Sequence, residues 1–76
     1  MQTKSPNFQD TFLSTAVRCA MPLTVFLMNG FQLHGVLRGY DSFAVILDSE
    51  GKQQMIYKHA ISTIIPLRPI DLNLPR

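Results

Sequence analysis

The chain has a single cysteine, a small net charge and no long apolar run, and the first and last of these each exclude a class of protein. Cys19 alone cannot form an intrachain disulfide, and it cannot supply a zinc site built from several cysteines. The formal net charge of +2 permits an anionic partner without requiring one. No stretch approaches the roughly 18 consecutive apolar residues of a membrane-spanning helix. We therefore expect neither a structural metal nor a membrane segment.

Two features favour cytoplasmic localisation. The N-terminal stretch MQTKSPNFQD lacks the basic region followed by an apolar run that is typical of a signal peptide. One unpaired cysteine also suits a reducing compartment.

The length of the chain limits how its fold can be stabilised. A chain of 76 residues allows one domain, residues 1–76, and leaves no room for a separate catalytic module. A domain of this size buries only about 60% of the surface of its unfolded chain, so its core alone is barely sufficient. Because disulfides and cysteine metal sites are excluded, association of identical chains remains as the stabilising device.

Apolar residues of the N-terminal quarter recur at the spacing of one face of a helix. They are Phe8, Phe12, Leu13, Ala16, Val17 and Ala20. Ser5 or Asn7 can cap the helix, and Pro6 suits the first turn after a Ser5 cap. Pro22 is expected to stop it. The pattern predicts a helix over about residues 6–20.

From Leu23 onward the period changes to two, with β-branched and aromatic residues in short runs. The runs predict five strands, at residues 23–28, 31–40, 43–48, 53–58 and 61–66. Between the first two, Asn29-Gly30 predicts a hairpin with a type I′ turn, which needs positive φ at both positions. Residues 67–76 are expected to form an extended tail.

The second predicted strand is interrupted by Gly35 and Gly39, and glycine within a strand commonly marks a bend or bulge. A helix followed by five short, strongly bent antiparallel strands is a small open barrel, mainly β in class. We expect the first and last strands to be its open edges. Pairing such an edge with the next subunit both covers it and closes a ring.

The chain has no pattern that is typical of a catalytic site. The carboxylates at positions 10, 41, 48, 50 and 71 include no pair with metal-site spacing, and no serine or cysteine lies in a nucleophile elbow. We therefore predict that the protein is not an enzyme and takes no cofactor and no small-molecule substrate. Asp41 is expected instead to order the turn after Tyr40 by accepting backbone hydrogen bonds.

Two patterns could contact nucleic acid, although each has a plainer alternative. Tyr57, Lys58 and His59 place an aromatic ring, an ammonium and an imidazole in succession, able to meet base edges and phosphate. Such a run at a turn is more often a solvated corner. Phe26 is a candidate stacking surface, whereas an aromatic residue in a strand is usually part of the core.

Most of the chain resembles the bacterial Sm-like RNA chaperone family, Hfq. Residues 23–47, LTVFLMNGFQLHGVLRGYDSFAVIL, look like the first Sm motif, and residues 56–64, IYKHAISTI, look like the second in its Hfq form. In the helix, QD followed by FL within residues 9–13 also matches, so the resemblance covers roughly residues 8–66. It implies a homo-hexameric ring that binds single-stranded RNA and helps small regulatory RNAs pair with messenger RNAs.

The resemblance further implies a proximal, pore-side face that binds uridine-rich RNA. Its residues would be Gln9, Ser42, Phe43, Lys58 and His59, with Phe43 coming from the neighbouring subunit. In this scheme Phe43 stacks on a base, Gln9 and Lys58 donate to uracil oxygens, and His59 reaches phosphate or ribose. Ser42 departs from the family, which usually has Gln or Asn there.

Two more surfaces are implied by the same resemblance. A distal face that binds adenine-rich RNA would comprise Phe26, Gly30, Phe31, Leu33, Gln54 and Thr63, with Gln54 and Thr63 supplying polar contacts to base edges. An outer rim would comprise Ser14, Arg18 and Tyr40. Many family members have several arginines on this rim, whereas this chain has only Arg18.

The sequence leaves several alternatives open. The ring could be a structural scaffold for a ribonucleoprotein or a protein complex, with RNA binding secondary. Arg18 could be an ordinary solvated charge. Cys19 is interpreted as a small packing residue, with redox sensing as the alternative.

Overall fold

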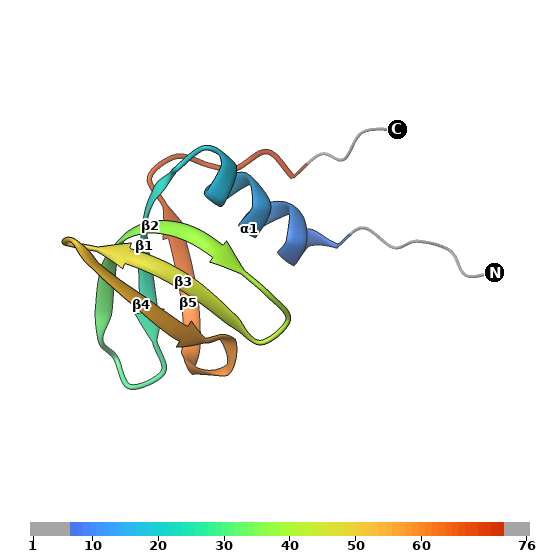
Figure 1. The fold of residues 1–76 in the computed structure, drawn as a ribbon. Helices are drawn as coiled ribbons and strands as arrows, with labels where there is room; N and C mark the ends of the chain where they lie inside the picture. The colour runs from blue at the N-terminus through green and yellow to red at the C-terminus, as the bar shows by residue number, and fades with distance from the viewer. Residues whose placement is uncertain (1–6, 73–76) are drawn as a thin grey trace.

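The computed structural model describes residues 7–72 and has one helix ahead of one sheet (Figure 1). The elements are α1 (Phe8–Arg18), β1 (Pro22–Leu27), β2 (Gln32–Tyr40), β3 (Ala44–Ser49), β4 (Lys52–Tyr57), the 3-10 turn η1 (Lys58–Ala60) and β5 (Ile61–Pro66). The predicted fold class is therefore confirmed, and each predicted strand is present to within a residue at either end. Within residues 7–72, no helix is long and apolar enough to cross a membrane.

Helix α1 begins after Asn7, which acts as its N-cap. The Asn7 side-chain oxygen accepts a hydrogen bond from the backbone N–H of Asp10 at 3.0 Å. The Asp10 carboxylate in this first turn complements the positive end of the helix dipole. Ser5 and Pro6, the other predicted start residues, lie outside the described part of the chain.

The other end of α1 is closed by the backbone, well before Pro22, so the prediction that Pro22 stops the helix is wrong. The chain reverses at Ala20, whose φ is 49°. The Ala20 N–H donates to the Val17 carbonyl at 3.1 Å, and the Met21 N–H donates to the Ala16 carbonyl at 3.0 Å. These two bonds form a Schellman motif, in which a left-handed residue terminates the helix.

The buried side of α1 is shorter than its apolar pattern predicted. The helix residues in the core cluster or packed against it are Phe12, Leu13, Ala16 and Val17. Phe8 and Ala20, at the two ends of the predicted stripe, are exposed. Cys19 is exposed as well, so its interpretation as a packing residue is wrong.

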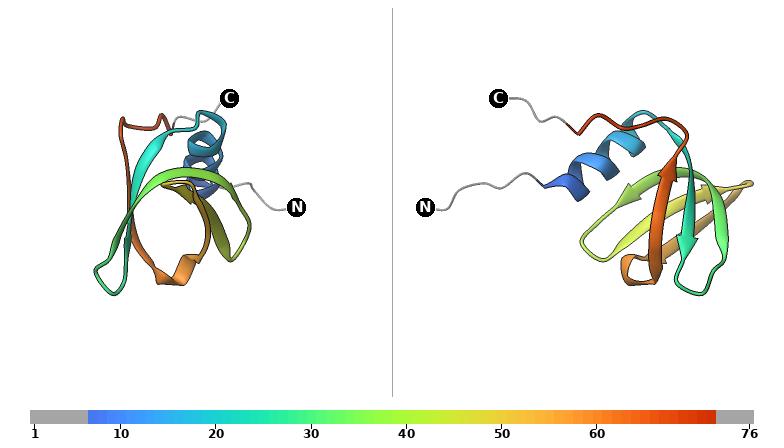
Figure 2. Two further views of the ribbon diagram at one scale, coloured as in Figure 1. Left: turned by 60° about the vertical axis from the view of Figure 1, so that its left-hand side comes forward. Right: turned by 180° about the vertical axis from the view of Figure 1, so that it is seen from behind.

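The strands form one antiparallel sheet in the order β4-β3-β2-β1-β5, which curls into an open barrel, while α1 lies over β2 (Figure 2). Strand β1 pairs with both β2 and β5. It is therefore inside the sheet, and the edges are β4 and β5. The prediction that the first strand is an edge is wrong because β5 returns from the end of the chain to cover it.

The hairpin turns differ from the predicted geometry. Gly30 has a φ of 94°, but Asn29 is not in the positive region, so the predicted type I′ turn is wrong although the hairpin is present. Asn29 Oδ1 instead accepts a hydrogen bond from the Phe31 N–H at 3.0 Å. Consecutive positive φ values occur at Glu50 (54°) and Gly51 (78°), between the paired residues of β3 and β4. The type I′ geometry is thus at the hairpin between β3 and β4.

Strand β2 bends where its partner strands change. Its first half pairs with β1, and from Val36 onward it pairs with β3. A Cβ atom added to Gly35 would collide with the carbonyl oxygen of Asp48 and lie 3.0 Å from the carbonyl carbon. The Ser49 hydroxyl donates to the His34 carbonyl at 2.6 Å in the same place. Gly35 is therefore required by the close approach of β3, and only a residue without a side chain fits.

One apolar cluster joins the inner side of the sheet to α1. Its buried members are Leu13, Ala16, Met21, Leu23, Val25, Leu37, Val45, Leu47 and Ile56. Because α1 and four of the five strands contribute to it, this cluster holds the helix against the sheet.

Because of the bend, we expect alanine substitutions at the two glycines of β2 to lower the free energy of unfolding by different amounts. Gly35→Ala should lower the free energy of unfolding by about 1 to 3 kcal/mol or more, the usual penalty for overpacking, because backbone atoms block the added methyl group. Gly39→Ala is the matched control, since nothing lies within 4 Å of its added Cβ and its φ is not positive. Denaturant unfolding at equal chain concentration measures both, and equal losses would contradict the role given to Gly35.

Candidate nucleic-acid interface

The first turn of α1, the turn after β2 and the start of η1 meet around one polar pocket of about 430 Å³. The residues that line it are Asn7, Gln9, Asp10, Tyr40, Asp41, Ser42 and Lys58. Three of the predicted proximal residues, Gln9, Ser42 and Lys58, thus share one pocket within a single chain. The pocket is suited to a polar planar group because amides, a hydroxyl and an ammonium are available to it as hydrogen-bond donors.

Asp41 orders the loop at the edge of this pocket, as its turn position predicted. Its Oδ1 accepts hydrogen bonds from the backbone N–H groups of Phe43 at 2.8 Å and Ala44 at 2.9 Å. These bonds lower the pKa of Asp41 below its ordinary value of 3.8, and the charge of Lys58 lowers the pKa further, while partial desolvation opposes both. The ionised carboxylate therefore holds the loop that presents Phe43.

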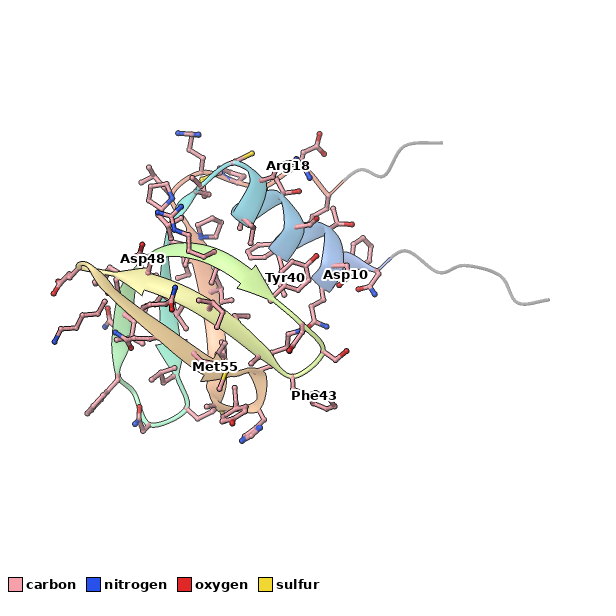
Figure 3. All side chains as sticks on the ribbon, viewed as in Figure 1. Asp10, Arg18, Tyr40, Phe43, Asp48 and Met55 are labelled. Atoms are coloured by element: carbon pink, nitrogen blue, oxygen red, sulfur yellow. The ribbon has the colours of Figure 1, made fainter. Side chains whose placement is uncertain are left out.

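Phe43 is 76% exposed at the tip of that loop. Its ring points away from the body of the domain, as Figure 3 shows. Its backbone is nevertheless fixed, because the Phe43 carbonyl accepts a hydrogen bond from the Lys58 N–H at 2.7 Å. A rigid backbone with a free aromatic face can stack on a base or on a neighbouring chain. The ring does not line the polar pocket of its own chain.

The three residues Tyr57, Lys58 and His59 divide into two groups. The rings of Tyr57 and His59 stack on each other, with centroids 5.8 Å apart and planes inclined by 11°. The Lys58 ammonium instead lies 5.7 Å from the centroid of the Tyr40 ring. Lys58 therefore belongs to the polar pocket, whereas His59 is exposed beside Tyr57 on η1.

A second hollow of about 280 Å³ adjoins the same residues. It is lined by Gln9, Phe12, Leu13, Val45, Lys58, Ile61, Ser62, Thr63 and Ile64. Gln9 and Lys58 line both hollows, so their side chains stand between a polar and a mainly apolar space. Thr63, which the resemblance assigns to the distal face, also lines this hollow.

The pairing of β1 with its neighbours organises part of the predicted distal set. Phe26 pairs with Thr63 on β5 and with Gln32 on β2. Directly paired residues of antiparallel strands project from the same face, so these three side chains form a row. Phe26 is half-buried and is not a member of the buried core, so the alternative that it is a core residue is wrong.

The remaining distal candidates lie in two different environments. Gly30 and Phe31 are exposed at the turn between β1 and β2, where Phe31 is 66% exposed. Leu33 pairs with the buried Val25 and packs against the core. Gln54, on β4, is half-buried and pairs with a buried leucine of β3. Within one chain, the structure does not bring Leu33 and Gln54 into the row formed by Phe26.

The predicted rim residues also divide. Ser14 is half-buried, and its hydroxyl donates to the Thr11 carbonyl within α1 at 3.3 Å. Arg18 is exposed in the last turn of the helix. Tyr40, by contrast, lines the polar pocket beside Lys58. Within residues 7–72 there is no group of three or more His, Cys, Asp or Glu side chains able to hold a metal ion.

The polar pocket also contains Asn7 and Asp10, which were not predicted to be site residues, and Tyr40, which the family resemblance assigns to the rim instead. Asn7 and Asp10 flank the predicted Gln9 in the first turn of the helix, and Tyr40 directly precedes Asp41. A signal was present, since residues around an N-cap share one end of a helix. The contact between Tyr40 and Lys58 had no local signal because it joins distant parts of the chain.

A helix ahead of a five-stranded, strongly bent antiparallel sheet, with polar residues gathered at the turns, defines an Sm-like domain. The family model for the Hfq protein matches residues 8–71. The chain belongs to the Hfq family.

Individual relatives are similar over most of their length. An RNA-binding protein Hfq from Desulfitobacterium hafniense is 60% identical over 70 residues, which cover 91% of this chain and 84% of the relative. Its counterpart from Moorella thermoacetica is 58% identical over 72 residues, covering 95% and 86%. A crystal structure of "the pleiotropic translational regulator, Hfq" superposes with a TM-score of 0.77 at 49% identity, covering 78% of this chain and 98% of that one. None of these names describes an enzyme, in agreement with the expectation from the sequence.

The lowered pKa of Asp41 predicts a pH-dependent contribution to stability. Because the folded-state pKa lies below the unfolded one, the carboxylate stabilises the fold above the unfolded pKa, and this stabilisation is lost as the pH falls through the folded pKa. Asp41→Asn should therefore be less stable than the native chain near neutral pH, with the difference shrinking in acid. Denaturant unfolding between about pH 7 and pH 2 measures this. Asp41→Ala, which lacks the acceptor, should remain the least stable throughout, and a pH-independent gap between native and Asn chains would contradict the role of the charge.

Proposed function

We propose that this protein is an RNA chaperone that binds uridine-rich and adenine-rich single-stranded RNA on opposite faces of a ring and promotes the pairing of small RNAs with messenger RNAs. The observation that carries the proposal is the polar pocket in which Gln9 and Lys58 meet beside the loop that exposes Phe43. The similar chains from D. hafniense and M. thermoacetica are named as RNA-binding proteins, which supports an RNA ligand.

The chemistry of the pocket supports uracil as the base bound there. Gln9 and Lys58 are hydrogen-bond donors for the two carbonyl oxygens of uracil, and Ser42 can donate or accept at its remaining edge. Phe43 supplies a stacking face, which single-stranded RNA requires for tight binding without base pairing. His59, exposed next to Tyr57, is available for phosphate or ribose.

The opposite surface supports a second RNA. The row that contains Phe26 and Thr63 offers an aromatic face next to a hydroxyl, a combination that stacks on a purine and contacts its edge. Phe31 at the adjoining turn offers a second aromatic face. In this proposal Leu33 and Gln54 contribute from a neighbouring subunit or through the open end of the barrel.

Ring formation follows from the two free sheet edges. Within residues 7–72, strands β4 and β5 each have one side without a partner strand, and both bear exposed apolar side chains, Met55 and Tyr57 on β4 and Ile65 on β5. Pairing β4 of one copy with β5 of the next covers both edges and repeats around an axis. Six copies would hold two RNAs close together, raise their effective concentration and reduce the repulsion of their phosphates.

Two sets of substitutions separate the faces. Lys58→Ala should weaken oligo(U) binding far more than oligo(A) binding, because it removes a charge and a donor from one face only. Phe43→Ala should cost about 1 to 3 kcal/mol per stacked base on the same RNA. Phe26→Ala and Phe31→Ala are the reciprocal variants and should damage oligo(A) binding while sparing oligo(U). Fluorescence anisotropy at fixed salt measures all four, and equal losses for both RNAs would rule out separate faces.

The ring itself predicts a defined mass. Native mass spectrometry should detect six chains, because the core of one chain is small and two sheet edges need partners. Met55→Asp, which places a charge on the edge strand β4, should shift the population toward smaller species. A native chain that remains monomeric at micromolar concentration would contradict the ring. A ring that binds neither RNA would favour the alternative of a structural scaffold for a ribonucleoprotein or a protein complex.

A further inference from the structure

We infer that Tyr40 is a positioning residue for RNA binding: the face of its ring holds the Lys58 ammonium at the polar pocket. The inference deepens the proposed function and rests on it. It concerns a contact between two side chains of one chain, and it requires no contact between Tyr40 and RNA.

The Lys58 ammonium needs to be positioned because two spaces are open to its side chain. It lines both the polar pocket with Asp41 and Ser42 and the mainly apolar hollow with Phe12 and Ile64. A lysine side chain has four rotatable bonds, and fixing them costs up to about 2 kcal/mol of conformational entropy. If the ammonium were free to move between the two spaces, RNA binding would have to supply all of this cost.

The Tyr40 ring is suited to hold the ammonium in the polar space. Lys58 Nζ lies 5.7 Å from the ring centroid, within the distance at which an aromatic face attracts a cation. Tyr40 is the last residue of β2 and packs against the core, so its ring cannot turn away freely. In Figure 3, Tyr40 lies below α1, and it lines the polar pocket together with Asp10.

Asp41 adds attraction from the same side without capturing the ammonium. Its Oδ1 already accepts two backbone hydrogen bonds, from Phe43 and Ala44. The charge of Lys58 is nevertheless felt at this carboxyl. The ring face and the carboxylate therefore restrict the ammonium to one side, while its hydrogen-bond donors remain available to a base.

The proposed contact depends on the aromatic ring of Tyr40 and does not depend on its hydroxyl group. An attraction between a cation and an aromatic face depends on the electron density of the ring, whereas a direct RNA contact at the rim would use the hydroxyl or require an exposed ring. Tyr40→Phe should therefore bind oligo(U) almost as the native chain does. Tyr40→Leu, which keeps an apolar side chain against the core, should bind oligo(U) about two- to fivefold more weakly, the loss of one exposed cation–π contact.

The decisive test replaces Tyr40 by phenylalanine analogues with increasing ring fluorination, in the assembled native chain. Fluorine withdraws electron density with little change in ring shape, so oligo(U) affinity should fall step by step while oligo(A) affinity stays constant. A purely structural role would give no graded loss. In parallel, the NMR signals of the Lys58 side-chain methylene next to nitrogen should carry a ring-current shift that is lost in Tyr40→Leu.

Lys58→Ala distinguishes failure of this inference from failure of the proposed function. If Lys58→Ala leaves oligo(U) binding unchanged, the pocket does not bind uridine and the proposed function of that face fails. If Lys58→Ala weakens binding but the fluorinated series and Tyr40→Leu do not, the positioning role of Tyr40 is overturned. If Tyr40→Leu weakens oligo(U) binding as much in the Lys58→Ala background as in the native one, Tyr40 acts independently of Lys58 and the inference is equally overturned.

Discussion

The close approach of β3 to β2 at Gly35 is the constraint on which the rest of the structure depends. Strand β2 serves two partners in turn, β1 along its first half and β3 along its second, and this exchange requires the strand to bend. At the bend the backbones come too close for any side chain at position 35, and the Ser49 hydroxyl bonds to the His34 carbonyl there. A flat β2 would hold all five strands in an open plane, and the apolar cluster inside the curl would have no enclosed volume to fill.

The two halves of the bent strand β2 each contribute to one of the candidate surfaces. The second half of β2 ends at Tyr40 and leads into the loop ordered by Asp41, so it supplies one wall of the polar pocket. The first half pairs with β1 and so fixes the row that contains Phe26 and Gln32. One strand thus contributes to both candidate surfaces. Because each surface is built on paired backbone rather than on long loops, the side chains have little freedom to drift.

The local sequence pattern was sufficient to predict the helix and the strands. It failed where the structure depends on an unusual backbone conformation or on contacts between distant residues. The change of period at Leu23 located the five strands, and the turn chemistry of Asp41 was foreseen from its position alone. The end of α1 was missed because it depends on a left-handed alanine, a conformation that alanine rarely adopts. The edge position of β5 was predicted correctly, but β4 was missed as the other edge because the pairing of β1 with β5 joins distant parts of the chain. The candidate proximal residues came from the family resemblance, and the contact of Tyr40 with Lys58 emerged only in three dimensions.

The pairing of Phe26 with Thr63 limits how chains of this kind can change during evolution. Side chains alternate between the two faces of a strand, so inserting or deleting one residue in β1 or β5 would exchange inward and outward side chains from that residue onward. Both packing and the outward row would be lost in a single step. Substitutions are open to these strands, but changes of length are not. Such changes are tolerated best at the exposed Glu50-Gly51 turn, whose residues lie outside both surfaces.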